Sequence, residues 1–232
     1  MQYKKIKKGI FKARPNRFIA IVEVDGKDEV CHVKNTGRCK ELFIPGAEVI
    51  LEESDNLSRK TKYDVIAVYK GSELINVDSQ APNKVFFEWV EKSGYFGENA
   101  FIKPECTYRN SRFDFYIENG ERKVFVEVKG VTLEKNGEVS FPDAPTLRGV
   151  KHIKELAECV KEGFEAYIFF VIQMENVSYF VPNRLTHNEF AETLIEAKRN
   201  GVNVKCVNSE VTENSLEIKD FIEFKKEGKY FG

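Results

Sequence analysis

Asp114, Glu127 and Lys129 are the residues whose types and spacing could support chemistry in this chain. They lie in residues 110–130, NSRFDFYIENGERKVFVEVKG, where alternating apolar residues flank the dipeptide Asn119-Gly120. This pattern predicts a β-hairpin. Because side chains alternate between the faces of a strand, Glu127 and Lys129 share a face, and Asp114 joins them if the register unites the polar faces. The apolar residues of the first strand are expected together on the other face: Phe113, Phe115 and Ile117.

Phosphodiester hydrolysis is the reaction that such a group would serve. A hard cation neutralises the scissile phosphate and activates water, and Mg²⁺ prefers carboxylates, carbonyls and water as ligands. Asp114 and Glu127 would hold Mg²⁺ or Mn²⁺ together with the Val128 carbonyl. Lys129 would orient the water or offset charge on the phosphorus. The alternative is a surface ladder in which Arg112 and Lys129 pair with the two carboxylates across the strands.

An all-β domain is expected at residues 1–81. Short alternating runs with Gly, Pro and Asn turns between them predict five strands, at residues 18–24, 29–34, 47–51, 63–69 and 73–77. A small barrel of the OB type fits this number of strands, and a plain β-sandwich is the alternative.

A second domain, of mixed-sheet α/β type, is expected at residues 82–232. Helices are predicted at 83–92, 147–160 and from a capping-box pattern at Thr186 to about residue 199. The apolar run at 166–173 has the length and composition of a buried parallel strand, and residues 201–207 are predicted as the last strand. The whole chain is therefore predicted as a two-domain protein, with an N-terminal β-barrel and a C-terminal domain of α+β or α/β type.

Local basic segments contrast with a formal net charge of −1. Residues 1–20 hold seven Lys and Arg residues and no acid, and further basic residues flank Gly37 or lie on one face of the predicted helix at 147–160. We expect these groups to contact phosphates, although solvated loops and helix faces with internal ion pairs are the alternative. The candidate DNA-binding residues are Lys4, Lys5, Lys7, Lys8, Arg14, Arg17, Arg38, Lys40, Arg148, Lys151 and His152.

The sequence gives less information about the cellular compartment and the oligomeric state of the protein. The five cysteines form no CxxC pair, which gives little support to a zinc or redox site. No signal-peptide pattern and no apolar run near membrane length is present, so we expect no membrane partner and a reducing, cytoplasmic setting. The oligomeric state stays open, a homodimer included.

Five motifs carry a resemblance to a known family: FKARPNRF (11–18), HVKNTGRCKELFIPG (32–46), NSRFDF (110–115), VEVKGVTL (126–133) and FPDAPTLRGVKHIKEL (141–156). In these motifs, and along essentially its whole length, the chain resembles the sugar fermentation stimulation protein A family. The resemblance implies an N-terminal OB-fold joined to a domain of the PD-(D/E)xK nuclease superfamily. It also implies DNA as a partner and a link to the regulation of sugar-utilisation genes.

The resemblance places the superfamily signature on Asp114, Glu127 and Lys129. Phe113 stands where many superfamily members have a proline. Gln173, at the end of the predicted buried strand, resembles an accessory polar position. Glu88 on the helix at 83–92 is either a solvated carboxylate or an auxiliary acid of the site.

Three functions are compatible with these features. The first is a DNA-binding protein with a nuclease-type site that depends on Mg²⁺ or Mn²⁺. The second is a non-catalytic DNA-binding regulator that kept the nuclease fold, although two carboxylates near phosphate would give such a protein little benefit. The third is an OB-fold module for carbohydrate or protein, whose binding would lack a steep dependence on salt.

Overall fold

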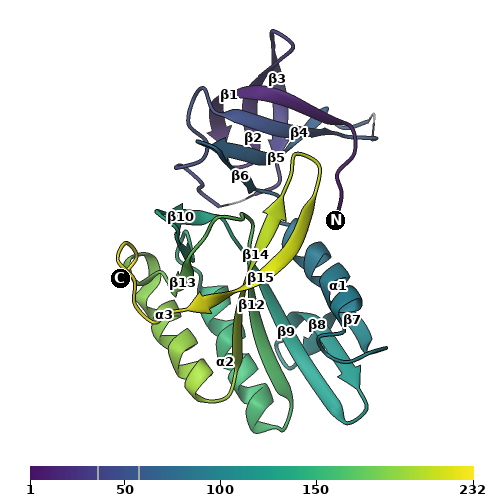
Figure 1. Cartoon of the computed structure of the whole chain (residues 1–232), viewed down its shortest axis with the longest axis vertical. Coiled ribbons are helices and arrows are strands. Elements are labelled where there is room, and N and C mark those ends of the chain that lie inside the picture. The colour runs from purple at the N-terminus through teal and green to yellow at the C-terminus, as the bar shows by residue number, and fades with distance from the viewer. Residues whose placement is uncertain (36, 57) are drawn as a thin grey trace.

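The computed structural model describes residues 1–35, 37–56 and 58–232 and shows two domains stacked along the long axis of the molecule (Figure 1). The upper domain in Figure 1 consists of six strands. They are β1 (Ile6–Asn16), β2 (Ile19–Val24), β3 (Lys27–Val33), β4 (Glu48–Glu53), β5 (Tyr63–Lys70) and β6 (Glu73–Asn76).

Five of these strands close into a barrel, which confirms the OB-type prediction over the sandwich. The sheet runs β3-β2-β1-β4-β5-β6, and a parallel pairing of His32 and Val33 on β3 with Asp64 and Val65 on β5 closes the ring of β1 to β5. β1 was not among the predicted strands. Only Gly9 and Phe11 are buried along it, and a Cβ at Gly9 would lie 2.5 Å from Val22 of β2. Lys7, Lys8 and Lys12, on either side of these two residues, conceal the strand pattern.

The second domain is built on a nine-stranded mixed sheet in the order β10-β11-β13-β15-β14-β12-β9-β8-β7. Its elements are α1 (Ala81–Ser93), β7 (Phe101–Tyr108), β8 (Ser111–Asn119), β9 (Arg122–Val131), β10 (Leu133–Lys135), β11 (Glu138–Phe141), α2 (Leu147–Lys161), β12 (Glu165–Ile172), β13 (Tyr179–Pro182), α3 (Arg184–Arg199), β14 (Asn203–Val211) and β15 (Leu216–Phe224). The buried strand at 166–173 is β12, and it runs parallel to both β9 and β14 as predicted.

Helices cover both faces of this sheet. Phe86 of α1 packs on Phe115 and Phe169, with ring centroids 5.1 and 4.9 Å away, whereas α2 and α3 lie against the other face. Two predictions about the C-terminal half were wrong. The strand at 201–207 is not the last, because β15 follows it. The side chain of Asn183, and not Thr186, caps α3 by accepting the Thr186 N–H at 3.0 Å.

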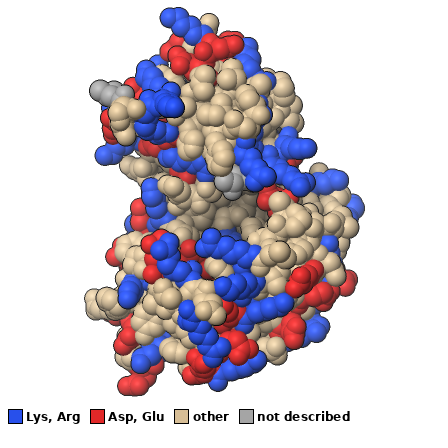
Figure 2. Space-filling model, turned by 180° about the vertical axis from the view of Figure 1, so that it is seen from behind, with Lys and Arg blue, Asp and Glu red and all other residues tan. Residues whose placement is uncertain are grey.

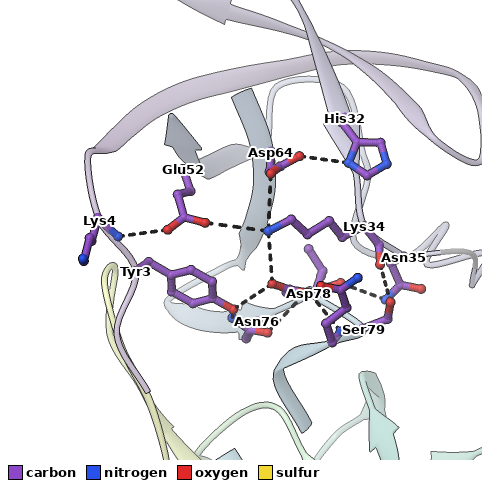
Figure 3. Close-up of polar contacts among 12 residues, drawn as sticks. Tyr3, Lys4, His32, Lys34, Asn35, Glu52, Asp64, Asn76, Asp78 and Ser79 are labelled. Carbon is purple, nitrogen blue, oxygen red and sulfur yellow. Dashed lines mark hydrogen bonds and ion pairs between the residues drawn. The ribbon is translucent and has the colours of Figure 1, made fainter. Parts of the chain in front are cut away.

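A polar network joins the two domains, and Figure 3 shows its centre at Lys34. The Lys34 ammonium lies 3.3 Å from Asp64 and 3.7 Å from Glu52 on the barrel, and 3.6 Å from Asp78 in the segment that leads to α1. Asn35 donates from Nδ2 to the Val77 carbonyl at 3.0 Å. The barrel is therefore fixed to the base of α1 through hydrogen bonds and ion pairs.

The first residues of the chain, predicted within the N-terminal domain, lie on the second one. The Met1 amino group donates to the Leu216 carbonyl at 2.8 Å and pairs with Glu88 at 2.7 Å. Gln2 bridges to Ser215 of the β14–β15 connection. Among the described residues, no helix is long and apolar enough to cross a membrane.

Asp64 makes the stability of the barrel depend on pH in the acidic range. Burial alone would raise the pKa of Asp64, but hydrogen bonds from Arg59 and His32 and the charge of Lys34 outweigh it and hold this pKa at about 2, below the usual 3.8. A lowered pKa contributes stability above the unfolded value that is lost as the pH falls through the folded value. We expect the free energy of unfolding to fall by about 2 kcal/mol from this group between pH 4 and pH 2. Urea titrations of wild type and Asp64→Asn across this range measure the effect, and parallel pH profiles of the two proteins would contradict it.

Candidate functional site

β8 and β9 form the predicted hairpin with an altered turn. Asn119 pairs with Arg122, so Gly120 and Glu121 are the central residues instead of Asn119 and Gly120. Gly120 has a φ of +58° in the first central position, where such a turn favours glycine.

The sequence predicted Phe113, Phe115 and Ile117 on the same face of β8, and this prediction is wrong for Phe113. Phe113 packs on Phe125 and near His152, on the face that α2 covers. Phe115, two residues on, packs on Phe86 of α1. The alternation therefore breaks at Asp114, which lies between the two phenylalanines. At this break the Asp114 carboxylate is directed to the backbone of the neighbouring strand β9.

The two strands separate next to Asp114. Their pairing ends at Phe115 and Val126, and the Val128 N–H donates to Asp114 Oδ2 at 2.8 Å in place of a strand partner. The N–H and C=O of one residue in a strand lie on the same side, so the Val128 carbonyl points to this gap too. Asn83, in the first turn of α1, donates to Asp114 Oδ1 at 2.9 Å. No sequence motif marks Asn83, because its role depends on where α1 docks.

Glu127 is the most enclosed group of the site, with 2% of its surface exposed. Its Oε1 accepts from His152 Nδ1 at 2.5 Å and from the Lys129 ammonium. Its Oε2 is buried and has no hydrogen-bond partner in the described part of the chain. A buried carboxylate oxygen without a partner is costly, so its retention points to a ligand at this position.

The two carboxylates influence each other's protonation. Burial and the neighbouring charge of Glu127 raise the pKa of Asp114 above its usual value. Burial acts in the same direction on Glu127, but the hydrogen bond from His152 and the charge of Lys129 outweigh it and lower the pKa of Glu127. Two neighbouring carboxylates with opposite pKa shifts are typical of a functional site.

The donor set suits a hard divalent cation. The unpartnered Oε2 of Glu127, the Asp114 carboxylate and the Val128 carbonyl are all oxygen ligands, as Mg²⁺ and Mn²⁺ prefer. In residues 1–35, 37–56 and 58–232, no three His, Cys, Asp or Glu side chains come together as metal ligands. An ion here would keep several waters, which is how Mg²⁺ is usually bound and what hydrolysis requires.

The surface ladder predicted as the alternative does not form as a whole. Arg112 pairs with Glu105 of β7 at 3.2 Å and not with Asp114. Lys129 does pair with Glu127, and 20% of its side chain is exposed. The ammonium is thus held at the carboxylate and is still open to solvent, as a group that contacts substrate must be.

The three candidates on α2 have different positions. His152 is buried against Glu127, so its assignment as a DNA contact was wrong. Arg148 is exposed and donates from Nε to His152 Nε2 at 3.4 Å. Because Nε2 accepts this hydrogen bond, the ring proton of His152 is on Nδ1, and Nδ1 is the donor to Glu127. Lys151 is half exposed and donates to the Asn110 carbonyl at 2.6 Å.

Glu88 and Gln173, the two candidates for auxiliary groups of the site, make their polar contacts away from the carboxylate pair. Glu88 pairs with the Met1 amino group at 2.7 Å, so its ion-pair contact is with the start of the chain. Gln173 is buried at the domain junction, where its Nε2 donates to Asn76 Oδ1 at 2.7 Å and to the Asp78 carbonyl at 3.0 Å. It therefore takes part in the junction and not in the carboxylate pair.

A basic groove runs between the barrel and the segment before α2. It has a volume of about 580 Å³ and is lined by Arg14, Asn16, Arg17, Gly37, Arg38, Lys40, Phe43, Ala144 and Pro145. Figure 2 shows Lys and Arg side chains gathered on the sides of a hollow between the two domains. Arg17, Arg38 and Lys40 have no carboxylate within ion-pair distance among the described residues, whereas Arg14 donates to the Arg38 carbonyl at 2.7 Å and supports the loop. The three unpaired cations are thus available to an anionic ligand.

The N-terminal lysines differ from the basic groove, because most of them have acidic neighbours. Lys5 pairs with Asp55 at 2.5 Å, Lys7 with Asp25 at 3.2 Å, and Lys8 with Glu213. Lys4 forms no ion pair within the described ranges, and its backbone N–H donates to Glu52. The charge that the sequence shows on this segment is therefore largely compensated in three dimensions.

Comparison with known proteins agrees with this architecture. The model of the N-terminal OB domain of the sugar fermentation stimulation protein family matches residues 13–77, and the model of its RE domain matches residues 80–215. The chain is 60% identical over 225 residues to the sugar fermentation stimulation protein homolog of Desulfitobacterium hafniense, covering 97% of this chain and 98% of the relative. It is 57% identical to the homolog of Clostridium beijerinckii, with 96% and 99% covered.

A solved structure has the same two-domain arrangement. The SfsA protein of Pyrococcus furiosus, determined in complex with Ca²⁺, superposes with a TM-score of 0.88 at 29% identity, with 97% of this chain and 98% of that chain covered. The family models, the relatives and this structure agree over nearly the whole length, and the chain belongs to the sugar fermentation stimulation protein family.

Proposed function

We propose that this protein binds DNA and holds Mg²⁺ or Mn²⁺ between Asp114 and Glu127 at a site for phosphodiester hydrolysis. The observation that carries the proposal is the buried Oε2 of Glu127, which no donor among the described residues satisfies and which lies near a second carboxylate, Asp114, whose pKa the charge of Glu127 raises. The Ca²⁺ named for the Pyrococcus furiosus relative supports a divalent cation in this fold. The uncompensated cations of the basic groove support DNA as the ligand.

The residues of the site have separate tasks in this proposal. Asp114 is held by the Val128 N–H and Asn83, and Glu127 by His152, so both carboxylates are oriented before an ion arrives. A bound cation would neutralise phosphate charge and lower the pKa of a bound water. Lys129 places a positive charge beside the same carboxylate, where it would contact the attacked phosphate and offset the charge that develops on it.

Metal binding provides a direct test. Calorimetric titration with Mn²⁺ should show one site per chain in the wild type and a large loss of affinity in the Asp114→Asn, Glu127→Gln double variant. The two changes keep the shape of the side chains and remove only charge and ligand basicity. The Glu118→Gln variant, at the far end of β8, is the matched control and should bind like wild type. Unaltered binding in the double variant, with the fold intact, would place the metal elsewhere.

The basic groove predicts how binding depends on salt. Replacing Arg17, Arg38 and Lys40 with alanine should weaken DNA binding for all sequences and reduce the slope of log affinity against log salt by about 1 for each phosphate that is no longer neutralised. Replacing Lys5, Lys7 and Lys8 removes the same charge from positions that already have acidic partners, and we expect a smaller change in slope. Fluorescence anisotropy over a salt series measures both slopes. Equal effects of the two triple variants would contradict the assignment of the groove.

A further inference from the structure

A second, smaller cavity lies beside the carboxylate site at the junction of the two domains. It has a volume of about 180 Å³, the room of about six water molecules. Its walls come from both domains and include Asn35, Ser79, Gly130, Phe141, Asp143 and Gln173. It lies at the carboxyl ends of the parallel strands β9, β11 and β12, which is where open α/β sheets bind ligands.

The cavity is adjacent to the proposed metal site through two elements. Gly130 of its wall follows Lys129 directly on β9. A Cβ at Gly130 would lie 2.7 Å from Pro82, the residue before Asn83, which holds Asp114. On β9, only Val128 and Lys129 lie between the cavity wall at Gly130 and the carboxylate residue Glu127. A polymer bound at the metal would extend past this cavity.

Two residues that line the cavity, Gln173 and Asp143, each offer a hydrogen-bond acceptor oxygen. Gln173 is 1% exposed, and both donor bonds of its Nε2 go to the junction, which leaves Oε1 over Gly130 with no donor among the described residues. Asp143 accepts the Arg38 N–H on Oδ2 at 2.9 Å, and the described residues give its Oδ1 no donor. The nearby hydroxyl of Ser79 is already used as a donor to the Lys34 carbonyl. A ligand of this cavity must therefore supply N–H or O–H donors.

These two acceptors favour a base over a phosphate. The Asp143 carboxylate repels an anion, and Gln173 offers a phosphate no free donor. Phe141 provides an apolar aromatic wall, since its ring packs on Phe170 and Phe190 and is still partly exposed. A planar ring with an exocyclic amino group matches both the wall and the acceptors, in the way that acidic side chains accept from the cytosine amino group.

We propose that this cavity is a subsite for one unpaired nucleobase that carries an amino group, next to the scissile phosphate. In a duplex the amino group is engaged in base pairing, so the subsite selects single-stranded or locally unpaired DNA. This inference rests on the proposed DNA-binding function and adds to it the form of DNA that is recognised. Thymine lacks the amino group and is the poorest ligand of the subsite.

The test compares two pyrimidines on the same backbone. Anisotropy titrations with labelled oligo(dC) and oligo(dT) in Ca²⁺ should give an affinity about tenfold higher for oligo(dC) with the wild type, the discrimination expected of one hydrogen-bonded base. Asp143→Asn keeps the acceptor for the Arg38 N–H and turns the free oxygen into a donor, and it should abolish the preference. Leu133→Trp, which fills the cavity from its rim, should do the same. The control Asp28→Asn removes an equal charge from an exposed position of the barrel and should retain the preference.

The outcomes separate the two proposals. The subsite is refuted if the wild type binds both oligonucleotides equally. It is also refuted if Asp143→Asn raises the affinity for both by the same factor, because Asp143 is then only a repulsive surface charge. DNA binding stands in either case. If the wild type binds neither oligonucleotide nor duplex DNA, the proposed function fails together with the subsite. Thermal melts of the folded variants show that any loss of preference is not a loss of structure.

Discussion

Replacing Lys129 with alanine is expected to lower the rate of metal-dependent DNA cleavage by about 10²–10³-fold, the usual effect of removing one charged group that stabilises a transition state. The ammonium lies against Glu127 and is partly open to solvent, so it can meet a phosphate bound at the carboxylates. Binding of the ion should weaken far less, because Lys129 is not a ligand. Single-turnover cleavage of labelled DNA in Mn²⁺ measures the effect.

Lys123→Ala is the matched control for this variant. Lys123 lies on the same strand, is exposed, and pairs in register with Glu118 near the hairpin turn, away from the carboxylates. We expect it to cleave like the wild type. If Lys129→Ala retains full activity while Asp114→Asn loses it, the lysine is only a counter-ion of Glu127 and has no part in the chemistry.

The His152→Leu variant is expected to lower the affinity for Mn²⁺ by about 10–100-fold, as is common when a group that orients a metal ligand is lost. His152 is buried and donates to Glu127 Oε1, which fixes the carboxylate with Oε2 left free for the ion. The same change should lower the free energy of unfolding by about 1–3 kcal/mol, because Glu127 stays buried with one donor fewer. Calorimetry gives the first quantity and urea denaturation the second.

A conservative variant distinguishes orientation from mere stability. His152→Gln can still donate an amide N–H to Glu127 and should recover part of the metal affinity. Lys154→Ala, on the exposed side of α2 where Lys154 pairs with Glu189, should alter neither quantity. Equal metal affinity in His152→Leu and wild type would show that Glu127 needs no support from α2.

Local patterns in the sequence were sufficient for the hairpin and most helices. β8 and β9 follow from alternation and a glycine turn, and α2 begins after Thr146, whose Oγ1 accepts the Gly149 N–H at 3.0 Å. Strands with weak alternation could not be predicted in this way. β1 exposes most of its residues, and β15 has a largely exposed pattern with one fully buried end at Leu216. Their positions are set by the strands on either side of them.

The arrangement of the site depended on tertiary contacts that no motif encodes. Glu127 and Lys129 could be paired from their spacing on one strand, because side chains two residues apart share a face. The contact of His152 with Glu127 requires α2 to dock on the sheet, and the pairing of Glu88 with Met1 requires the chain start to cross to the second domain. Likewise, the basic run at residues 1–20 was visible in the sequence, but its acidic partners come from turns and loops farther along the chain.

The most direct test of the proposed function is cleavage of labelled single-stranded, duplex and branched DNA by wild type and Glu127→Gln across a series of Mn²⁺ concentrations. The variant keeps the size of the side chain and removes the charge that the buried Oε2 would offer to the ion. We predict that the wild type cleaves DNA only when Mn²⁺ or Mg²⁺ is present and that Glu127→Gln does not. Equal cleavage by the two proteins would indicate a contaminant, and binding without cleavage by a metal-loaded wild type would identify a DNA-binding regulator that kept the nuclease fold.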